Sequence, residues 1–211
     1  MTTIVLIAKE PLPGKAKTRL APAVSLEQAA ELAAAAIDDT LRALEHVPAT
    51  RRILLFDGER MPQRAARYDV IPQVGGTLDE RLGAIFDEVD GPMLLIGMDT
   101  PQVTAEHLAP AFVDWPEHTD AWFGPAVDGG FWALGMRAPR GDLIRGIPMS
   151  QANTGELQLA RLTRAGLTVG MLPELTDVDT IDAAREVAAD APHTLFARRL
   201  CGFDHMVEVA A

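Results

Sequence analysis

The sequence predicts an α/β domain in which helices cover both faces of a mostly parallel sheet. Short apolar runs of strand length alternate with longer segments whose apolar residues recur every three to four positions. Gly, Pro and Asp residues that favour turns separate the two kinds of segment. Strands joined by right-handed helical crossovers are buried on both faces, so this pattern favours parallel strands that are apolar throughout.

The first half of the chain follows this alternation without a break. Residues 3–8 are the first apolar run. Residues 25–47 carry a helical stripe of apolar side chains, and Ser25 with Gln28 predicts a capping box at its start. The elements expected next are a strand at 52–57, a strand at 69–73, a helix at 78–89 and a central strand at 92–98.

The second half contains one hairpin among its crossovers. Thr104 is expected to cap a helix that runs to about Val113. Residues 121–136 are typical of two strands joined by a turn, which would form a small β-hairpin extension. The last expected elements are a helix at 154–165, a strand at 167–172 and a helix at 180–190.

Length and composition limit the class of protein. The 211 residues suit one domain, expected over 1–190 with a C-terminal tail over 191–211. The formal charge of −11 argues against nucleic-acid or anionic-membrane binding, which need a broad basic face. We expect a cytoplasmic protein, because no secretory leader or membrane-length apolar run is seen and Cys201 is the single cysteine. The apolar tail could also pair two copies in a homodimer.

Positive charge gathers directly after the first strand, in KEPLPGKAKTRLAP at residues 9–22. The prolines and Gly14 make this segment an irregular loop, which can turn backbone N–H groups and cationic side chains toward one anion. The glycine patterns of the Walker A loop and of dinucleotide-binding folds are absent. A solvated basic loop is the alternative. The basic residues are Lys9, Lys15, Lys17 and Arg19.

Carboxylates follow two later elements. Asp99 ends the central strand in LLIGMDTP, where it could hold a divalent metal that bridges phosphate oxygens, or could only form an Asx turn. Asp177 and Asp179 lie two apart in TDVDT, so in an extended segment their side chains point the same way. They could complete the metal site, whereas Asp179 or Thr180 could instead cap the following helix.

Two glycine loops have a structural and a functional interpretation. In VDGGF, Asp128 could bond a sugar hydroxyl while Gly129 and Gly130 let a ligand approach the backbone, or the segment could be only a hairpin turn. In QVGGTLDERL, Gly75 and Gly76 could pass close to a nucleobase or form a plain loop.

Four segments in this order resemble a known family. They are KEPLPGKAKTRLAP, LLIGMDTP, VDGGFWALGM and LTDVDT, and with the elements between them they cover the chain to about residue 190. The set is similar to the small bacterial GT-A-fold proteins of the nucleotide-diphospho-sugar transferase superfamily. Within it, the chain resembles the DUF2064 group, which includes glycosyltransferases of the arsenosugar-biosynthesis type. The AKTRLAP loop is also similar to that of phospholactate guanylyltransferases.

This resemblance implies a single Rossmann-like GT-A domain and a role for each loop. It implies that the first loop, from Gly14 to Arg19 and including Thr18, embraces nucleotide phosphates. It implies a base-side role for Gln73, Gly75 and Gly76. Asp99 would be the principal ligand of Mg²⁺ or Mn²⁺ and Asp179 would complete the site. The loop of Asp128, Gly129 and Gly130 would face the sugar or the acceptor.

Three functions remain open on these grounds. The first is glycosyl transfer from a nucleotide-sugar to a small acceptor. The second is nucleotidyl transfer to a phosphorylated acceptor with release of pyrophosphate. In either reaction Lys15, Lys17 and Arg19 would stabilise charge on phosphate oxygens, beside the metal on Asp99. The third is nucleotide binding without catalysis.

Overall fold

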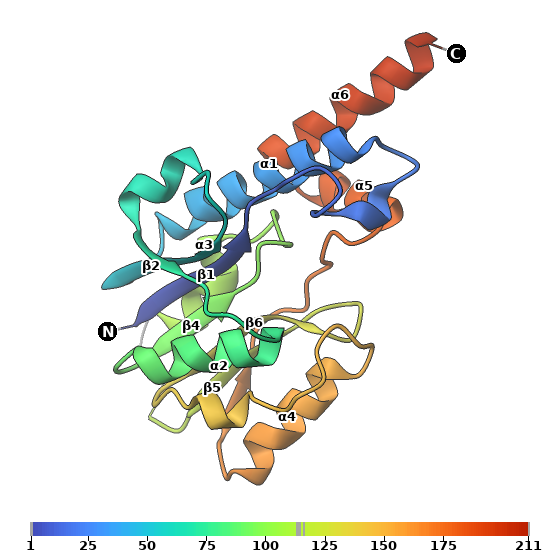
Figure 1. Cartoon of the computed structure of the whole chain (residues 1–211). Coiled ribbons are helices and arrows are strands. Elements are labelled where there is room, and N and C mark those ends of the chain that lie inside the picture. The colour runs from blue at the N-terminus through green and yellow to red at the C-terminus, as the bar shows by residue number, and fades with distance from the viewer. Residues whose placement is uncertain (1, 113–114, 116, 211) are drawn as a thin grey trace.

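Three layers make up the molecule in the computed structural model, which describes residues 2–112, 115 and 117–210, with side chains through Phe203. A seven-stranded sheet lies between two layers of helices (Figure 1). The strands are β1 (Thr3–Lys9), β2 (Arg51–Asp57), β3 (Asp69–Pro72), β4 (Met93–Ile96), β5 (Ala121–Pro125), β6 (Phe131–Met136) and β7 (Val169–Met171).

The strand order is β3-β2-β1-β4-β6-β5-β7. All neighbouring strands are parallel except where β6 pairs, because β6 is antiparallel to both β4 and β5. The carboxyl ends of the parallel strands therefore meet the start of β6 at one edge of the sheet. The mostly parallel sheet predicted from sequence is confirmed, and its hairpin strands are full members of the sheet.

Helices cover both faces because each carries an apolar stripe. The helices are α1 (Leu26–Leu44), α2 (Leu78–Glu88), α3 (Ala105–Leu108), α4 (Thr154–Arg164), α5 (Ile181–Asp190) and α6 (Leu195–Ala210). On one face, Ile37 and Leu41 of α1 and Leu108 of α3 pack in one buried cluster with alternate residues of the strands. On the other face, Phe86 of α2 and Leu162 of α4 pack on the residues between them. This alternation follows from the two-residue period of a strand.

Capping fixes where the principal helices begin. Ser25 and Gln28 form the predicted capping box, with Gln28 N donating to Ser25 Oγ at 3.2 Å and Ser25 N donating to Gln28 Oε1 at 2.8 Å. Thr104 caps α3 as expected, through its Oγ1. The short helix continues as a 3₁₀ turn, η3 (Ala109–Ala111). The expected end of this helix at Val113 lies outside the described residues.

The C-terminal tail contains a long helix. Helix α6 runs alongside α1, and its C-terminal end extends beyond the rest of the chain (Figure 1). Phe196, Leu200 and Phe203 pack with Leu32 of α1 and Val187 of α5 in a third buried cluster. Within the described residues, no helix combines the length and apolar character needed to span a bilayer.

Candidate functional site

A cleft of about 730 Å³ opens at the carboxyl ends of β1 and β4. Its lining comes from the loop after β1, from α2, and from the loops that flank β6 and precede α5. In sheets of this topology, ligands bind beyond the carboxyl ends of the strands. The cleft is therefore where the fold predicts a ligand site.

The loop after β1 is anchored by apolar residues and exposes basic ones. Ala16 and Leu20 are fully buried, with Leu20 at the end of the 3₁₀ turn η1 (Thr18–Leu20). Lys17 precedes this turn in the left-handed region, at φ 51° and ψ 35°. Such a conformation is uncommon for a residue other than glycine and costs about 1–2 kcal/mol. The anchored turn compensates by directing the Lys17 side chain into the cleft.

The ammonium of Lys17 lies between two carboxylates. Its Nζ is 2.6 Å from Asp99 Oδ1 and 3.0 Å from Asp179 Oδ1, and the side chain is 6% exposed. Arg19 Nη1 lies 3.3 Å from Asp179 Oδ2. Burial alone would lower the pKa of Lys17, but the two carboxylates outweigh burial and raise that pKa. Lys17 is thus a fixed positive charge within a partly buried network.

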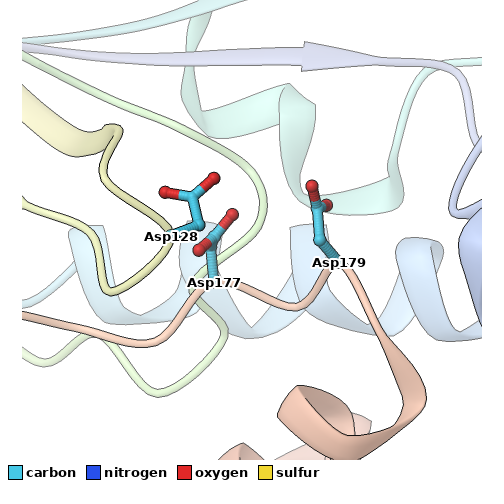
Figure 2. Close-up of side chains that lie close together, drawn as sticks. All are labelled: Asp128, Asp177 and Asp179. Carbon is cyan, nitrogen blue, oxygen red and sulfur yellow. The ribbon is translucent and has the colours of Figure 1, made fainter. Parts of the chain in front are cut away.

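Backbone pairing brings the acidic segment to the end of β4. Val178 N donates to Asp99 O at 2.9 Å, and Gln102 Nε2 donates to Thr176 O. The turn before β6 adds the carboxylate of Asp128, which lies beside Asp177 (Figure 2). Carboxylate oxygens of Asp128, Asp177 and Asp179 lie within 4.8 Å of one another. These three residues, the acidic triad, can hold a divalent metal, because carboxylates are ligands that Mg²⁺ and Mn²⁺ prefer.

Asp177 is the member of the acidic triad whose pKa is shifted most clearly. Burial, and then the charges of Asp128 and Asp179, raise the pKa of Asp177 to about 6. The side chains of Asp177 and Asp179 point the same way, as their spacing predicted (Figure 2). Thr180 caps α5 by accepting from Ala183 N at 3.2 Å, so the Asp179 carboxylate is free of that role.

The turn between β5 and β6 contains a glycine that the fold requires and a carboxylate that faces the cleft. Asp128 Oδ1 accepts from Gly130 N at 2.7 Å, which closes the turn. Gly129 has φ +88°, and a Cβ there would lie 1.9 Å from Ala152 O. Gly155 N donates to Gly129 O at 2.9 Å, which ties the turn to the start of α4. The glycine is needed for this close approach, and the turn holds Asp128 against the cleft.

Gln73 follows directly after β3, and its side chain makes three hydrogen bonds. Its Nε2 donates to Ala8 O at 2.8 Å and to Leu55 O at 3.2 Å. Its Oε1 accepts from Arg81 Nη1 at 2.7 Å. Gln73 therefore organises the strand ends and Arg81.

The structure brings most of the sequence-predicted residues to one cleft. Four glycines of the predicted set, Gly14, Gly75, Gly76 and Gly129, are not among the residues that line it. Asp128, expected to meet a sugar, lies in the acidic triad, while Asp99 lies outside the triad and pairs with Lys17. The lining residues of the set are Lys9, Lys15, Lys17, Thr18, Arg19, Gln73, Asp99, Asp128, Gly130, Asp177 and Asp179.

Sequence reasoning missed several residues of the cleft. Arg81 lies one turn into α2 within QVGGTLDERL, where a basic residue next to the glycine loop was the available signal. Thr100 is 1% exposed and its hydroxyl has no hydrogen-bond partner within the described structure. Ser150 lines the cleft with φ 58°, a conformation that no sequence pattern marks.

Comparison with known proteins gives one family match. The model of the family described as "Uncharacterized protein conserved in bacteria (DUF2064)" matches residues 40–151, which is more than half of the chain. The match includes Gln73, Asp99 and Asp128, and it excludes the first loop and the segment before α5. No curated protein matches the chain.

Solved structures with the same fold include several transferases. A candidate nucleotide-diphospho-sugar transferase from Desulfovibrio desulfuricans G20 superposes with a TM-score of 0.84 and 27% identity, over 98% of this chain and 96% of the other. A nucleotidyl transferase from Methanothermobacter thermautotrophicus gives a TM-score of 0.58 and 17% identity, over 94% and 98%. The CMP:2-keto-3-deoxy-manno-octonic acid synthetase complexed with CTP gives 0.53 and 16%, over 91% and 98%. The chain thus has the GT-A-like transferase fold.

Proposed function

This chain belongs to the DUF2064 family, and we propose that it is a metal-dependent transferase that takes a nucleotide-sugar and transfers the glycosyl group to a small acceptor. The observation that carries the proposal is the juxtaposition of Lys17 and Arg19 with Asp99 and the acidic triad at the strand ends. A metal diphosphate requires both parts, because the cation needs carboxylates and the phosphate oxygens need positive donors.

The residues divide the work by charge. Asp177 and Asp179, with Asp128, would hold Mg²⁺ or Mn²⁺, which would screen the charge of the diphosphate when bound. Lys17 pairs with both Asp99 and Asp179, so the Asp99 carboxylate would become available to a cation only when the ammonium leaves it. Lys17 can then donate to a phosphate oxygen, while Asp99 joins the ligands of the cation as the sequence suggests.

The first loop would stabilise the leaving group. Lys15 and Lys9 are exposed at the cleft, and Arg19 is 72% exposed, so these side chains can turn to phosphate oxygens. Negative charge accumulates on the nucleoside diphosphate as the glycosyl bond breaks, and fixed cations lower the free energy of that state. The cleft side of the turn at Asp128 and Gly130 would face the transferred sugar.

Nucleotidyl transfer is the second candidate. The concentration of cations in the first loop suits a triphosphate and a phosphorylated acceptor equally well. In that reaction an acceptor phosphate oxygen attacks the α-phosphorus, the bond to the β-phosphate breaks, and pyrophosphate leaves. A phosphate nucleophile is already ionised, so no general base is required.

Ligand screening with product analysis separates these functions. We expect nucleotide-sugars with Mn²⁺ to raise the melting temperature, and incubation with acceptors to release a nucleoside diphosphate. Pyrophosphate release from a nucleoside triphosphate would instead establish nucleotidyl transfer. Binding with no turnover in any acceptor mixture would favour the non-catalytic module, and no stabilisation by any nucleotide would remove all three.

A variant of the acidic triad tests the metal role within the same screen. Asp179→Asn should abolish the Mn²⁺-dependent part of the shift, because Asp179 belongs to the triad and also contacts Lys17. Asp190→Asn, at the exposed end of α5, is the matched control and should leave the shift unchanged. An equal Mn²⁺ response in both variants would exclude the triad from metal binding.

A further inference from the structure

Arg81 is a cation of the cleft that has no carboxylate partner in the described part of the chain. It lies on α2 and lines the cleft together with Leu78 and Leu82 of the same helix. The nearby acidic side chains of α2 are engaged elsewhere. Asp79 accepts from Gly146 N at 2.7 Å, and Glu80 accepts from Thr77 N at 2.8 Å in the capping box. The guanidinium is therefore turned toward the ligand space without a charge to balance it.

Gln73 holds this guanidinium in one place. The Gln73 amide is itself fixed, since both hydrogens of its Nε2 go to strand carbonyls. Its remaining oxygen accepts from Arg81 Nη1 at 2.7 Å. These three hydrogen bonds fix the orientation of the Gln73 amide. Gln73 in turn fixes the position of the Arg81 guanidinium relative to the sheet.

A second donor of Arg81 is buried without a partner. Arg81 Nε is buried and has no hydrogen-bond partner in the described structure. A buried donor on a charged group that lacks an acceptor is costly, by about 1–3 kcal/mol or more. Among the cations of the first loop, Lys17 has two carboxylate partners and Arg19 has one, whereas Lys9 and Lys15 are exposed to solvent. An unbalanced guanidinium in a chain of net charge −11 indicates that a ligand supplies the missing negative charge.

We propose that Arg81, positioned by Gln73, binds an oxyanion of the ligand at a point separate from the first loop. The oxyanion is a carboxylate or a phosphate group, because the planar guanidinium fork matches two oxygens of either. The inference rests on the proposed function in one respect: that function supplies the two molecules, acceptor and nucleotide, that could carry this oxyanion. Gln73 acts on this oxyanion through Arg81, which it positions.

The Arg81 side chain provides its own probe. In ¹⁵N-labelled protein, the Arg81 Nε–H resonance is assigned by its disappearance in Arg81→Lys. Titration with inorganic phosphate, and separately with acetate, should move this resonance in a saturable way. The experiment uses no nucleotide, so it can succeed where nucleotide binding fails. A resonance that responds to neither anion would overturn the proposal.

Variants distinguish anion binding at Arg81 from anion binding at the first loop. In Lys15→Met/Arg19→Met, the phosphate titration of the Arg81 resonance should persist with a dissociation constant within about threefold of the original. In the same background, equilibrium dialysis should show that Arg81→Met weakens phosphate binding at least tenfold. Arg164→Met, at the exposed end of α4 and away from the cleft, is the matched control. Loss of the titration with the first-loop cations would place the anion there and reject the assignment.

Two further measurements test the role of Gln73 and identify which molecule carries the oxyanion. Gln73→Leu keeps the charge of Arg81 but removes its fixed position, so phosphate affinity should fall severalfold; an unchanged affinity would overturn the role given to Gln73. Folding of this variant is checked by its circular dichroism. If saturating nucleotide and Mn²⁺ leave the Arg81 titration intact, the oxyanion belongs to the acceptor. If they suppress it competitively, it belongs to the nucleotide, and either result supports the site.

Discussion

Lys17 determines the charge of the site more than any other single residue. Its ammonium lies between Asp99 and Asp179, and the carboxylates of Asp128 and Asp177 lie close to Asp179. The position requires a left-handed backbone, which the structure maintains through the burial of Ala16 and Leu20 on either side. Backbone conformations of this kind concentrate at functional sites.

Replacement of Lys17 should change metal affinity in the absence of nucleotide. Lys17→Met removes a positive charge 3.0 Å from Asp179 Oδ1 and frees Asp99. We expect Mn²⁺ to bind about tenfold more tightly or better, since repulsion between the two cations disappears. Electron paramagnetic resonance of free Mn²⁺ measures this. Lys15→Met, at an exposed position, should change the affinity less than about twofold. Equal affinities in Lys17→Met and wild type would show that ammonium and metal do not compete.

Asp177 should make the stability of the metal-free protein depend on pH. Its pKa of about 6 in the folded state lies above the value of about 3.9 expected when unfolded. The folded protein thus binds this proton more tightly, so the contribution of Asp177 to stability falls as pH rises from about 4 to about 6 and stays low above that. Asp177→Asn should therefore raise the melting temperature at pH 8 and raise it clearly less at pH 4.5. Saturating Mn²⁺ should cancel the gain, and a gain of equal size at both pH values would contradict the assignment.

At the level of elements, the turn between β5 and β6 is what links the hairpin to the site. Gly129→Ala would place a methyl group against Ala152 O at a backbone with φ +88°. We expect a loss of about 2–4 kcal/mol in unfolding free energy, from overpacking and backbone strain together. Urea denaturation measures the change. Gly202→Ala is the comparison, because Gly202 lies within α6 with open space around it, and should gain about 0.5–1 kcal/mol. A Gly129→Ala protein as stable as wild type would show that the loops do not pack as described.

Helix α6 is fastened to α1 by one buried carboxylate. Asp39 accepts from Leu195 N at 3.0 Å and from Phe196 N at 2.8 Å, and it pairs with Arg42. Asp39→Ala would leave these N–H groups without an acceptor, and we expect unfolding free energy to fall by about 2 kcal/mol. Glu31→Ala, which removes the exposed Glu31–Arg199 pair across the same two helices, should cost less than about 1 kcal/mol. Chemical denaturation that finds the two variants alike would show that Asp39 does not fasten α6.

Across the whole molecule, the sequence predicted what depends on local pattern. The alternation of apolar runs and stripes predicted the sheet and its helices, and the strand-end rule predicted that the functional residues lie in one crevice beyond the strand ends. Pattern could not predict the partners. That Asp99 pairs with Lys17 while Asp128 joins Asp177 depends on how β6 enters the sheet between β4 and β5. Likewise, the sequence does not show that Arg81 lacks a carboxylate partner, because this depends on which side chains pack around it in three dimensions.

The pairing of the segment before α5 with the end of β4 has a kinetic consequence. Val178 N–H bonds to the Asp99 carbonyl, and Gln102 holds the carbonyl of Thr176, so the acidic residues sit on backbone already ordered by the sheet. The conformational entropy of these residues is therefore lost during folding and not during association. Ligand capture then does not wait for this segment to fold, and its rate depends on how the field of the basic loop steers the ligand and on how readily Lys17 leaves Asp99.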